Sequence, residues 1–235
     1  MQQFLKRVGA WFKGEPRPVI LMYHRVADLP YDPWGLAVKP ARFAAQMAFL
    51  KSERLPLPMD MFVEKLEDGT LPPHAVAVTF DDGYIDNLTH AKPILDQSGV
   101  PATVFLATAQ LGQDSEFWWD ELARLVLGQR GGADSQMQVG GRSIAVHLAS
   151  LAFDESVRTD WRAWQSPKTP RQQLYFDLWS SLRALGNTAR AEALDGLRQI
   201  FRSEAPDPSS LAMRPADISR LIALPGIEIG AHSQT

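Results

Sequence analysis

The chain has 235 residues, of which 45% are hydrophobic and 22% charged, so it is long and apolar enough to fold around a sizeable core. Its formal net charge is -3, from 24 Lys and Arg against 27 Asp and Glu, which disfavours a nucleic-acid backbone or an anionic membrane as a partner. The absence of cysteine excludes disulfides and thiolate metal sites. Any transition metal must therefore be bound by His and carboxylate side chains.

No apolar run reaches the roughly 20 residues of a membrane-spanning helix, and no signal peptide is recognisable. We therefore expect no transmembrane segment and a cytoplasmic location. Residues 4–13 place apolar side chains at helical spacing opposite basic ones, as an interfacial helix would. Packing of a short helix on the domain is the favoured interpretation, and a weak contact with a membrane surface is the alternative.

The predicted elements alternate between strands and helices over the first half of the chain. An apolar strand at 19–23 is followed by an amphipathic helix at 40–51, which opens on a proline, and by a second apolar strand at 75–80. A helix that ends at Ser98, before a glycine, leads to a third strand at 101–107. This order predicts parallel βα units, and so an α/β fold.

The middle of the chain changes pattern. Ser115 is a candidate cap for a helix, paired glycines at 140–141 predict a hairpin, and leucines recur at helical spacing from 174 to 185. A strand resumes at 227–231 and leads to His232. We therefore divide the chain into an N-terminal helix and linker (1–17), the first part of the main domain (18–111), a mainly helical insertion (112–215) and the resumed main domain (216–235).

Two consecutive carboxylates at the end of a buried strand repel each other unless a cation lies between them. Asp81 and Asp82 directly follow the strand at 75–80, and Gly83 allows the sharp turn that would bring both to its mouth. On these residues alone, a metal site and a polar turn that closes the strand are equally supported, because Asp-Gly turns are common.

His232 and His24 each end a predicted apolar strand, and the carboxyl ends of parallel strands converge on one face. A histidine in this position is more often structural than a ligand, but the convergence with Asp82 makes His232 a candidate metal ligand. For His24, the roles of metal ligand, substrate contact and structural histidine all stay open. The structural role is favoured, since no carboxylate neighbour in sequence fixes its tautomer.

The same residues resemble a known family. Residues 79–83 read Thr-Phe-Asp-Asp-Gly and residues 232–233 read His-Ser. These segments resemble the first two motifs of the polysaccharide deacetylases (the NodB-homology domain, carbohydrate esterase family 4), T-F-D-D-G and H-[ST]-x-x-H. Residues 21–26 and 99–106 are also similar to family segments, and Phe-Trp-Trp-Asp at 117–120 looks like the long-insert bacterial branch, which often acts in exopolysaccharide pathways.

The resemblance implies a fold, a site and a cofactor. The fold would be a distorted, incomplete (β/α) barrel with the helical insertion. Asp81 would be the general base on a metal-bound water, Asp82 and His232 would be metal ligands, and His24 is a weaker candidate for substrate binding. The metal would be divalent, and zinc suits one carboxylate with imidazoles, although nickel, cobalt and iron accept the same ligands.

Part of the family pattern is missing. The second histidine of the H-[ST]-x-x-H motif would fall one position beyond Thr235, and the later motifs with the orienting arginine, the aromatic wall and the acid histidine are absent. We therefore expect the 235-residue chain to be a truncated, inactive N-terminal portion of its parent enzyme.

Three functions remain in contention. The first is a metal-dependent hydrolase that removes N-acetyl groups from an amino-sugar polysaccharide resembling chitin, peptidoglycan or an exopolysaccharide. The second is a non-catalytic glycan-binding or scaffolding protein with a degenerate deacetylase fold. A magnesium phosphoesterase is disfavoured by His232, because Mg²⁺ prefers carboxylates and water.

Overall fold

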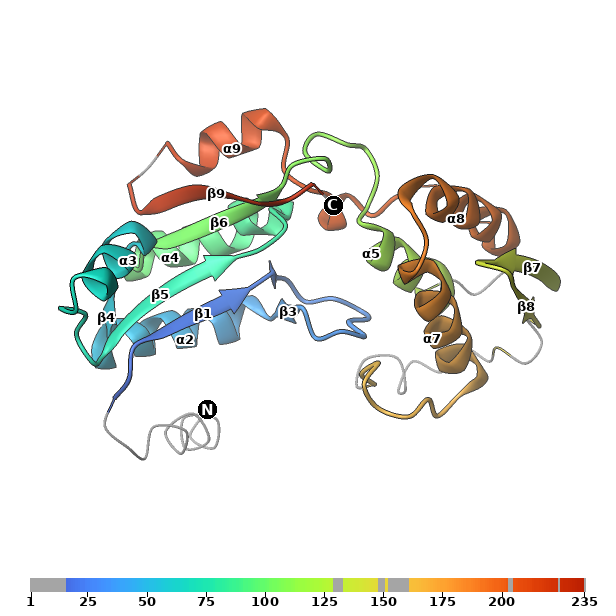
Figure 1. Cartoon of the computed structure of the whole chain (residues 1–235), viewed down its shortest axis with the longest axis horizontal. Coiled ribbons are helices and arrows are strands. Elements are labelled where there is room, and N and C mark those ends of the chain that lie inside the picture. The colour runs from blue at the N-terminus through green and yellow to red at the C-terminus, as the bar shows by residue number, and fades with distance from the viewer. Residues whose placement is uncertain are drawn as a thin grey trace. The chain divides into compact units, whose positions relative to one another are not determined.

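The structure is a computed structural model that describes residues 16–128, 133–147, 151, 161–202, 205–223 and 225–234. It divides into two compact units, each described here by itself (Figure 1). Unit 1 takes in the described residues of Met1–Ala27, Val38–Gly112 and Met213–Thr235. Unit 2 takes in those of Asp28–Ala37 and Gln113–Ala212.

Unit 1 is built on a parallel sheet with the strand order β1-β5-β6-β9, in which β4 also pairs with β5 (Figure 1). The strands are β1 (Val19–Tyr23), β4 (Leu55–Pro56), β5 (Ala75–Phe80), β6 (Ala102–Ala107) and β9 (Ile227–Ser233). Every residue of β5 is buried, which explains why its sequence is continuously apolar up to Thr79. Because the strands are parallel, their carboxyl ends lie at one edge of the sheet.

Helices pack on both faces of this sheet. Alternate residues of β5 divide between two clusters: Val76 and Val78 pack with α2 and α4, and Ala75 and Ala77 pack with Phe62 of α3. The remaining elements of unit 1 are α2 (Pro40–Glu53), α3 (Met59–Glu67), a π-helix (Asn87–Ala91), α4 (Lys92–Ser98), α9 (Pro215–Leu221) and the short strand β2 (Arg25–Val26). The helices that cover the sheet therefore lie between its strands in sequence.

Unit 2 is mainly helical. Its elements are α5 (Trp118–Ala123), a π-helix (Arg124–Gly128), β7 (Ser135–Val139), β8 (Arg142–Val146), α7 (Pro170–Arg183), α8 (Asn187–Phe201) and a 3₁₀ turn (Pro208–Ser210). Strands β7 and β8 form an antiparallel hairpin, and among the described residues they pair with no strand of the parallel sheet. Thr169 caps α7 by accepting a hydrogen bond from the Gln172 N–H.

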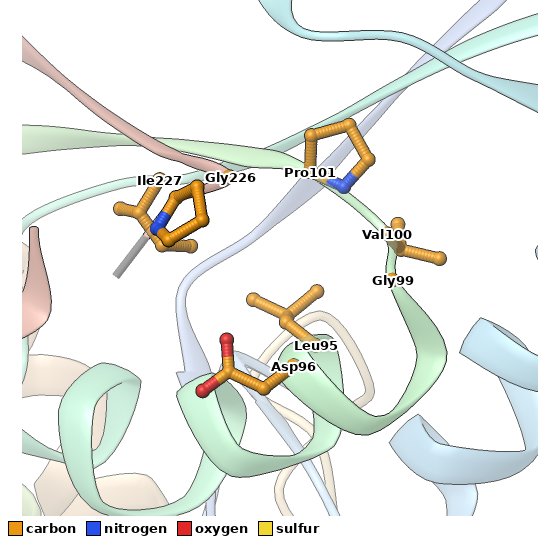
Figure 2. A pocket seen from close by; sticks show the side chains of 8 residues that line it. Leu95, Asp96, Gly99, Val100, Pro101, Gly226 and Ile227 are labelled. Carbon is orange, nitrogen blue, oxygen red and sulfur yellow. The ribbon is translucent and has the colours of Figure 1, made fainter.

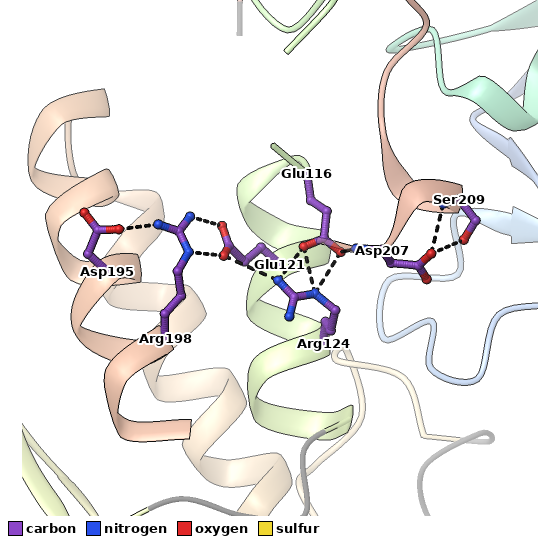
Figure 3. A network of polar contacts seen from close by, with 7 residues as sticks. All are labelled: Glu116, Glu121, Arg124, Asp195, Arg198, Asp207 and Ser209. Atoms are coloured by element: carbon purple, nitrogen blue, oxygen red, sulfur yellow. Dashed lines mark hydrogen bonds and ion pairs between the residues drawn. The ribbon is translucent and has the colours of Figure 1, made fainter. Parts of the chain in front are cut away.

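Two kinds of contact hold unit 2 together. Leu174, Leu178 and Leu182 of the predicted helical face are buried in its core, and Leu185 is partly buried against it. Trp34 packs against that core from the separate segment at 28–37. Figure 3 shows the second contact, a chain of ion pairs that joins Glu116, Glu121 and Arg124 to Arg198 of α8. Segment 28–37 is thus grouped with unit 2, although the sequence division placed it in 18–111.

Several sequence expectations can be compared with this fold. The parallel α/β organisation is confirmed, and β1, β5 and α4 lie where the apolar runs and the closing glycine predict. Helix α3 was missed, and α5 begins after Phe117, so Ser115 does not cap it. The closure of the sheet into a barrel and the domain boundaries stay predictions.

No helix in the described part of the chain is both long and apolar enough to cross a bilayer. The proposed interfacial helix at 4–13 lies outside the described residues.

Candidate active site

The candidate site lies at the carboxyl ends of β1, β5 and β9. Asp81 is the first residue after β5, and its backbone N–H donates to the Tyr23 carbonyl at 2.9 Å, which extends the pairing of β1 with β5 by one step. His24 follows Tyr23 directly, so the same hydrogen bond brings the backbones of Asp81 and His24 to the same edge of the sheet. Both side chains are half-buried.

A strained turn carries Asp82 out of the strand. Asp82 has φ of 71° and Gly83 has φ of 78°, so two successive residues adopt the left-handed region. A non-glycine residue rarely does so, but aspartate tolerates this conformation better than most. At Gly83 a Cβ would also lie 2.5 Å from Cδ2 of Leu106, so the buried Leu106 side chain would have to shift to admit it.

The carbonyls of this turn are held from two directions. The Asp82 carbonyl accepts the Ala107 N–H at 3.3 Å, and the Gly83 carbonyl accepts the Met213 N–H at 2.9 Å. Ala107 ends β6, and Met213 is the first residue of unit 1 after unit 2. The turn is therefore tied to the neighbouring strand and to the segment by which the chain returns from unit 2.

His232 reaches this turn through an irregularity in β9. In the register with β6, Ala231 pairs with Leu106 and Ser233 pairs with Ala107, so His232 is the extra residue of a β-bulge. A bulge redirects the side chain of the bulged strand. Nε2 of His232 lies 3.8 Å from Oδ1 of Asp82, with the imidazole 42% and the carboxylate 10% exposed. The structure thus brings together two side chains separated by 150 positions, as the sequence predicts.

Burial dominates the electrostatics of Asp82. It raises the pKa of the Asp82 carboxyl, the positive forms of His24 and His232 oppose that rise, and the charge of Asp81 adds to it. The other three candidate residues therefore all act electrostatically on Asp82. A carboxylate buried at neutral pH without a strong cationic partner is an unfavourable arrangement that a bound cation would relieve.

Asp82 and His232 fit a divalent metal. The 3.8 Å between their donor atoms is shorter than twice a zinc–ligand bond of about 2.0–2.2 Å, so one ion can contact both. A carboxylate oxygen with an imidazole nitrogen is a donor set that zinc accepts. Within the described ranges, no three His, Asp or Glu side chains are grouped closely enough to hold one ion together, so the described site supplies two protein donors.

Sequence reasoning missed three buried polar residues beside this site. Asp86 and Asn87 lie four and five positions after Asp82, and Arg25 follows His24; each is about 1% exposed. For Arg25 a signal was present in the sequence, since a charged residue between the apolar residues of a strand end is unusual. What no local pattern indicates is that these residues pair across 61 positions.

A cavity of about 540 Å³ lies elsewhere in unit 1 (Figure 2). It is bounded by the end of α4 and by the residues that precede β6 and begin β9, among them Gly99 and Gly226. These are the amino ends of parallel strands, so the cavity is at the opposite edge of the sheet from Asp82 and His232. None of the four candidate residues lines it.

Comparisons with known proteins agree with the motifs. Residues 68–147 match the family model of the polysaccharide deacetylases, which confirms the resemblance for the segment that contains Asp81 and Asp82. A putative polysaccharide deacetylase, YxkH of Bacillus subtilis (strain 168), is 32% identical over 109 residues, which are 44% of this chain and 37% of that protein. The chain thus spans well under half the length of this curated relative.

Solved structures of deacetylases are also similar in part. The Streptococcus pyogenes deacetylase PplD in complex with acetate is 27% identical over 47% of this chain and 52% of that one, with a TM-score of 0.38. IcaB from Ammonifex degensii is 16% identical over 88% of this chain and 96% of that one, with a TM-score of 0.37.

Proposed function

We propose, from the match of residues 68–147 to the polysaccharide deacetylases and from the geometry of the site, that this protein is a metal-dependent hydrolase of acetylated amino-sugar polysaccharides. The observation that carries the proposal is the 3.8 Å approach of His232 to Asp82, directly beside Asp81. The substrate class is a polymer that carries N-acetyl groups, such as chitin, peptidoglycan or an exopolysaccharide.

Asp81 and Asp82 take different roles in this proposal. Asp82 and His232 hold the metal, for which zinc is the first choice; when bound, such an ion lowers the pKa of water and polarises the acyl oxygen. Asp81 is half-buried and close enough to Asp82 to raise its pKa, so it is placed to accept the proton of the attacking water. The water oxygen bonds to the acyl carbon, the carbon–nitrogen bond breaks, and the proton taken from water ends on the leaving nitrogen, so that acetate and a free amine are the products.

His24 is proposed to contact the substrate. It is half-buried at the same mouth, and its charge acts on Asp82. The described donors alone leave a metal with two protein ligands, whereas catalytic zinc sites have three. We therefore propose that the 235-residue chain by itself binds zinc weakly and does not deacetylate the substrate.

One observation favours a second candidate. Because the described residues supply only two donors, a non-catalytic glycan-binding protein that retains the deacetylase fold is also consistent with the site. Both candidates predict carbohydrate binding, but only the hydrolase predicts acetate release. Acetate release therefore decides between them.

The test measures acetate release by the intact gene product, purified as its own gene encodes it, from N-acetylglucosamine oligomers and from acetylated cell-wall polymers. We expect zinc-dependent release that a chelator abolishes. Asp81→Asn should lower the rate by about 10²–10⁴-fold, the usual contribution of general-base catalysis, while zinc stays bound. His147→Gln, an exposed histidine of unit 2, is the control and should keep full activity.

Oligosaccharide binding without acetate release would reject the hydrolase and favour the glycan-binding protein. Equal activity of Asp81→Asn and wild type would reject Asp81 as the base.

A further inference from the structure

The backbone around His24 is held by side chains from the helix that follows the acidic turn. Nδ2 of Asn87 donates to the His24 carbonyl at 2.9 Å. Two residues further along, the Val26 N–H donates to Oδ1 of Asp86 at 3.0 Å. The backbone on the carboxyl side of the His24 side chain is therefore fixed by the segment that begins four positions after Asp82.

The side-chain amide of Asn87 has only one sensible orientation. Its Nδ2 group donates to the His24 carbonyl and also to Oδ1 of Asp86, at 2.9 and 3.2 Å. The reversed amide would direct its oxygen at two acceptors. The observed orientation leaves Oδ1 of Asn87 buried with no hydrogen-bond partner among the described residues, which is an unfavourable state. Such a cost is tolerated where the two donated hydrogen bonds are required.

Arg25 completes the group. Its Nε lies 2.9 Å from Oδ2 of Asp86, and the two side chains are 1% and 2% exposed. The guanidinium also lies 4.5 Å from the centre of the ring of Tyr84, which is fully buried. Both oxygens of Asp86 are therefore engaged, one by Arg25 and one by the residues that follow His24. An ion pair buried this completely has a defined geometry rather than a large stabilising effect.

We propose that Arg25, Asp86 and Asn87 are positioning residues that set the place of His24 relative to Asp82. The inference rests on the proposed function, because it assigns to this polar group the task of presenting His24 to the substrate. None of the three touches the substrate-facing atoms themselves. They act through the backbone of residues 24–26: Asn87 contacts the His24 carbonyl, Asp86 accepts the Val26 N–H, and Arg25 pairs with Asp86.

A purely structural role for Arg25, Asp86 and Asn87 would not account for the contacts of this group with the backbone beside His24. His24 is the single residue between β1 and β2, so its direction is not fixed by strand pairing. Asp82 lies in a turn with positive φ, and Asp86 and Asn87 belong to the same turn-and-helix segment. The pairing of β1 with β5 brings Tyr23 beside Asp81, and the contact from Asn87 to the His24 carbonyl adds a second link, between His24 and the segment that follows Asp82.

The first experiment observes His24 directly in the 235-residue chain. The Cε1–Hε1 signals of its five histidines are recorded by NMR and assigned with His24→Gln and similar single substitutions. We expect Asn87→Leu to shift or broaden the His24 signal and to leave those of His74 and His147 unchanged. The control is Thr103→Val, which removes another buried hydrogen bond, to Glu228, from the same sheet.

An unchanged His24 signal in folded Asn87→Leu would overturn the proposal, and so would an equal shift in Thr103→Val. If Asn87→Leu does not fold, Asn87→Ser replaces it, because its hydroxyl is too short to reach the His24 carbonyl and it leaves a smaller defect. This experiment needs no activity, so it decides the positioning role even if the proposed hydrolase fails.

The second experiment is a double-mutant cycle on acetate release by the intact gene product. We expect Asn87→Leu to lower kcat/KM about 10-fold with zinc affinity unchanged, as loss of a supporting hydrogen bond typically does. Combined with His24→Ala, it should add nothing to the effect of His24→Ala alone. Effects that multiply would overturn the proposal, whereas absence of acetate release from the wild type would reject the proposed function instead.

Discussion

Asp82 combines features that a residue selected for stability would not have. Its side chain is 10% exposed, its backbone is in the left-handed region, and the charge of Asp81 adds to the cost of its burial. Functional sites commonly concentrate such costs. The metal binding proposed for Asp82 requires an ionised carboxylate in this buried position. Removing its charge should therefore change the stability of the metal-free protein.

Asp82→Asn should make the metal-free protein more stable at pH 7, by about 0.5–2 kcal/mol, since asparagine keeps the shape and accepts positive φ but carries no charge. The pKa of Asp82 is raised in the fold, so the cost of its charge is full above the folded pKa and absent below the ordinary value of 3.8. The gain should therefore disappear as the pH falls towards 3.8. Urea denaturation in the presence of a chelator measures it, and a less stable variant at pH 7 would contradict the argument.

Gly83 offers a test of how closely the turn packs. Gly83→Ala should destabilise the protein by about 2–4 kcal/mol, because the new Cβ adds an overlap with Leu106 to the strain of positive φ. Gly69→Ala is the matched control, since Gly69 has φ of 67° with nothing within 4 Å of its Cβ position. The control should cost about 1–2 kcal/mol from backbone strain alone. Equal losses in thermal unfolding would show that the turn is free to move away from β6.

At the scale of elements, unit 2 depends on ion pairs as well as on its leucine core. Glu116 is fully enclosed, accepts hydrogen bonds from Nε of Arg124 at 2.8 and 3.0 Å, and also accepts the Asp207 N–H at 3.1 Å (Figure 3). Burial raises the pKa of Glu116, and its contacts with Arg124 only partly oppose that rise. The ion pair therefore orders the segments that flank α5 more than it stabilises them.

Glu116→Gln should lower the free energy of unfolding by about 1–3 kcal/mol at pH 7, since it weakens hydrogen bonds made to a charged group. Because the pKa of Glu116 is raised in the fold, its ionisation costs the wild type stability that returns as the pH falls, so the loss should grow as the pH falls towards 4.5. Arg220→Gln, which removes the exposed pair with Asp217, should stay within about 0.5 kcal/mol. Equal losses for the two variants in urea denaturation would count against this account.

The elements that the sequence predicts correctly are those with a local cause. Strand β5 is an uninterrupted apolar run, α2 begins at a proline, and α4 ends at Gly99 with φ of 68°. The sequence does not predict α3, because Pro56 and Pro58 indicate the end of the preceding helix, whereas Pro58 directly precedes the first turn of the next.

The residues of the candidate site were likewise predictable only where the sequence holds a local signal. Asp81, Asp82 and His232 stand out because each follows an apolar strand. The bulge that turns His232 towards Asp82 depends on the register between β6 and β9, which no pattern in β9 alone reveals. The pairing of Arg25 with Asp86 likewise depends on tertiary structure, since the two are 61 positions apart.

At the scale of the whole molecule, the long segment of unit 2 leaves and rejoins unit 1 at one point. The Gly112 N–H donates to the Met213 carbonyl at 3.2 Å, so the two ends of that segment are joined directly. Met213 also donates to the Gly83 carbonyl beside Asp82. The parallel sheet can therefore bring His232 to Asp82 although unit 2 lies between them in sequence.

Zinc titration of the 235-residue chain by calorimetry is the most direct test of the central claim, that Asp82 and His232 form one metal-binding pair with Asp81 as its neighbour. A matched control is present in unit 2, where Nδ1 of the exposed His147 lies 3.7 Å from Asp134. We expect weak binding that Asp82→Asn and His232→Gln each reduce at least about 10-fold, whereas Asp81→Asn and His147→Gln change it less than about 3-fold. Wild-type affinity in Asp82→Asn or His232→Gln, or loss of binding in His147→Gln, would contradict the account.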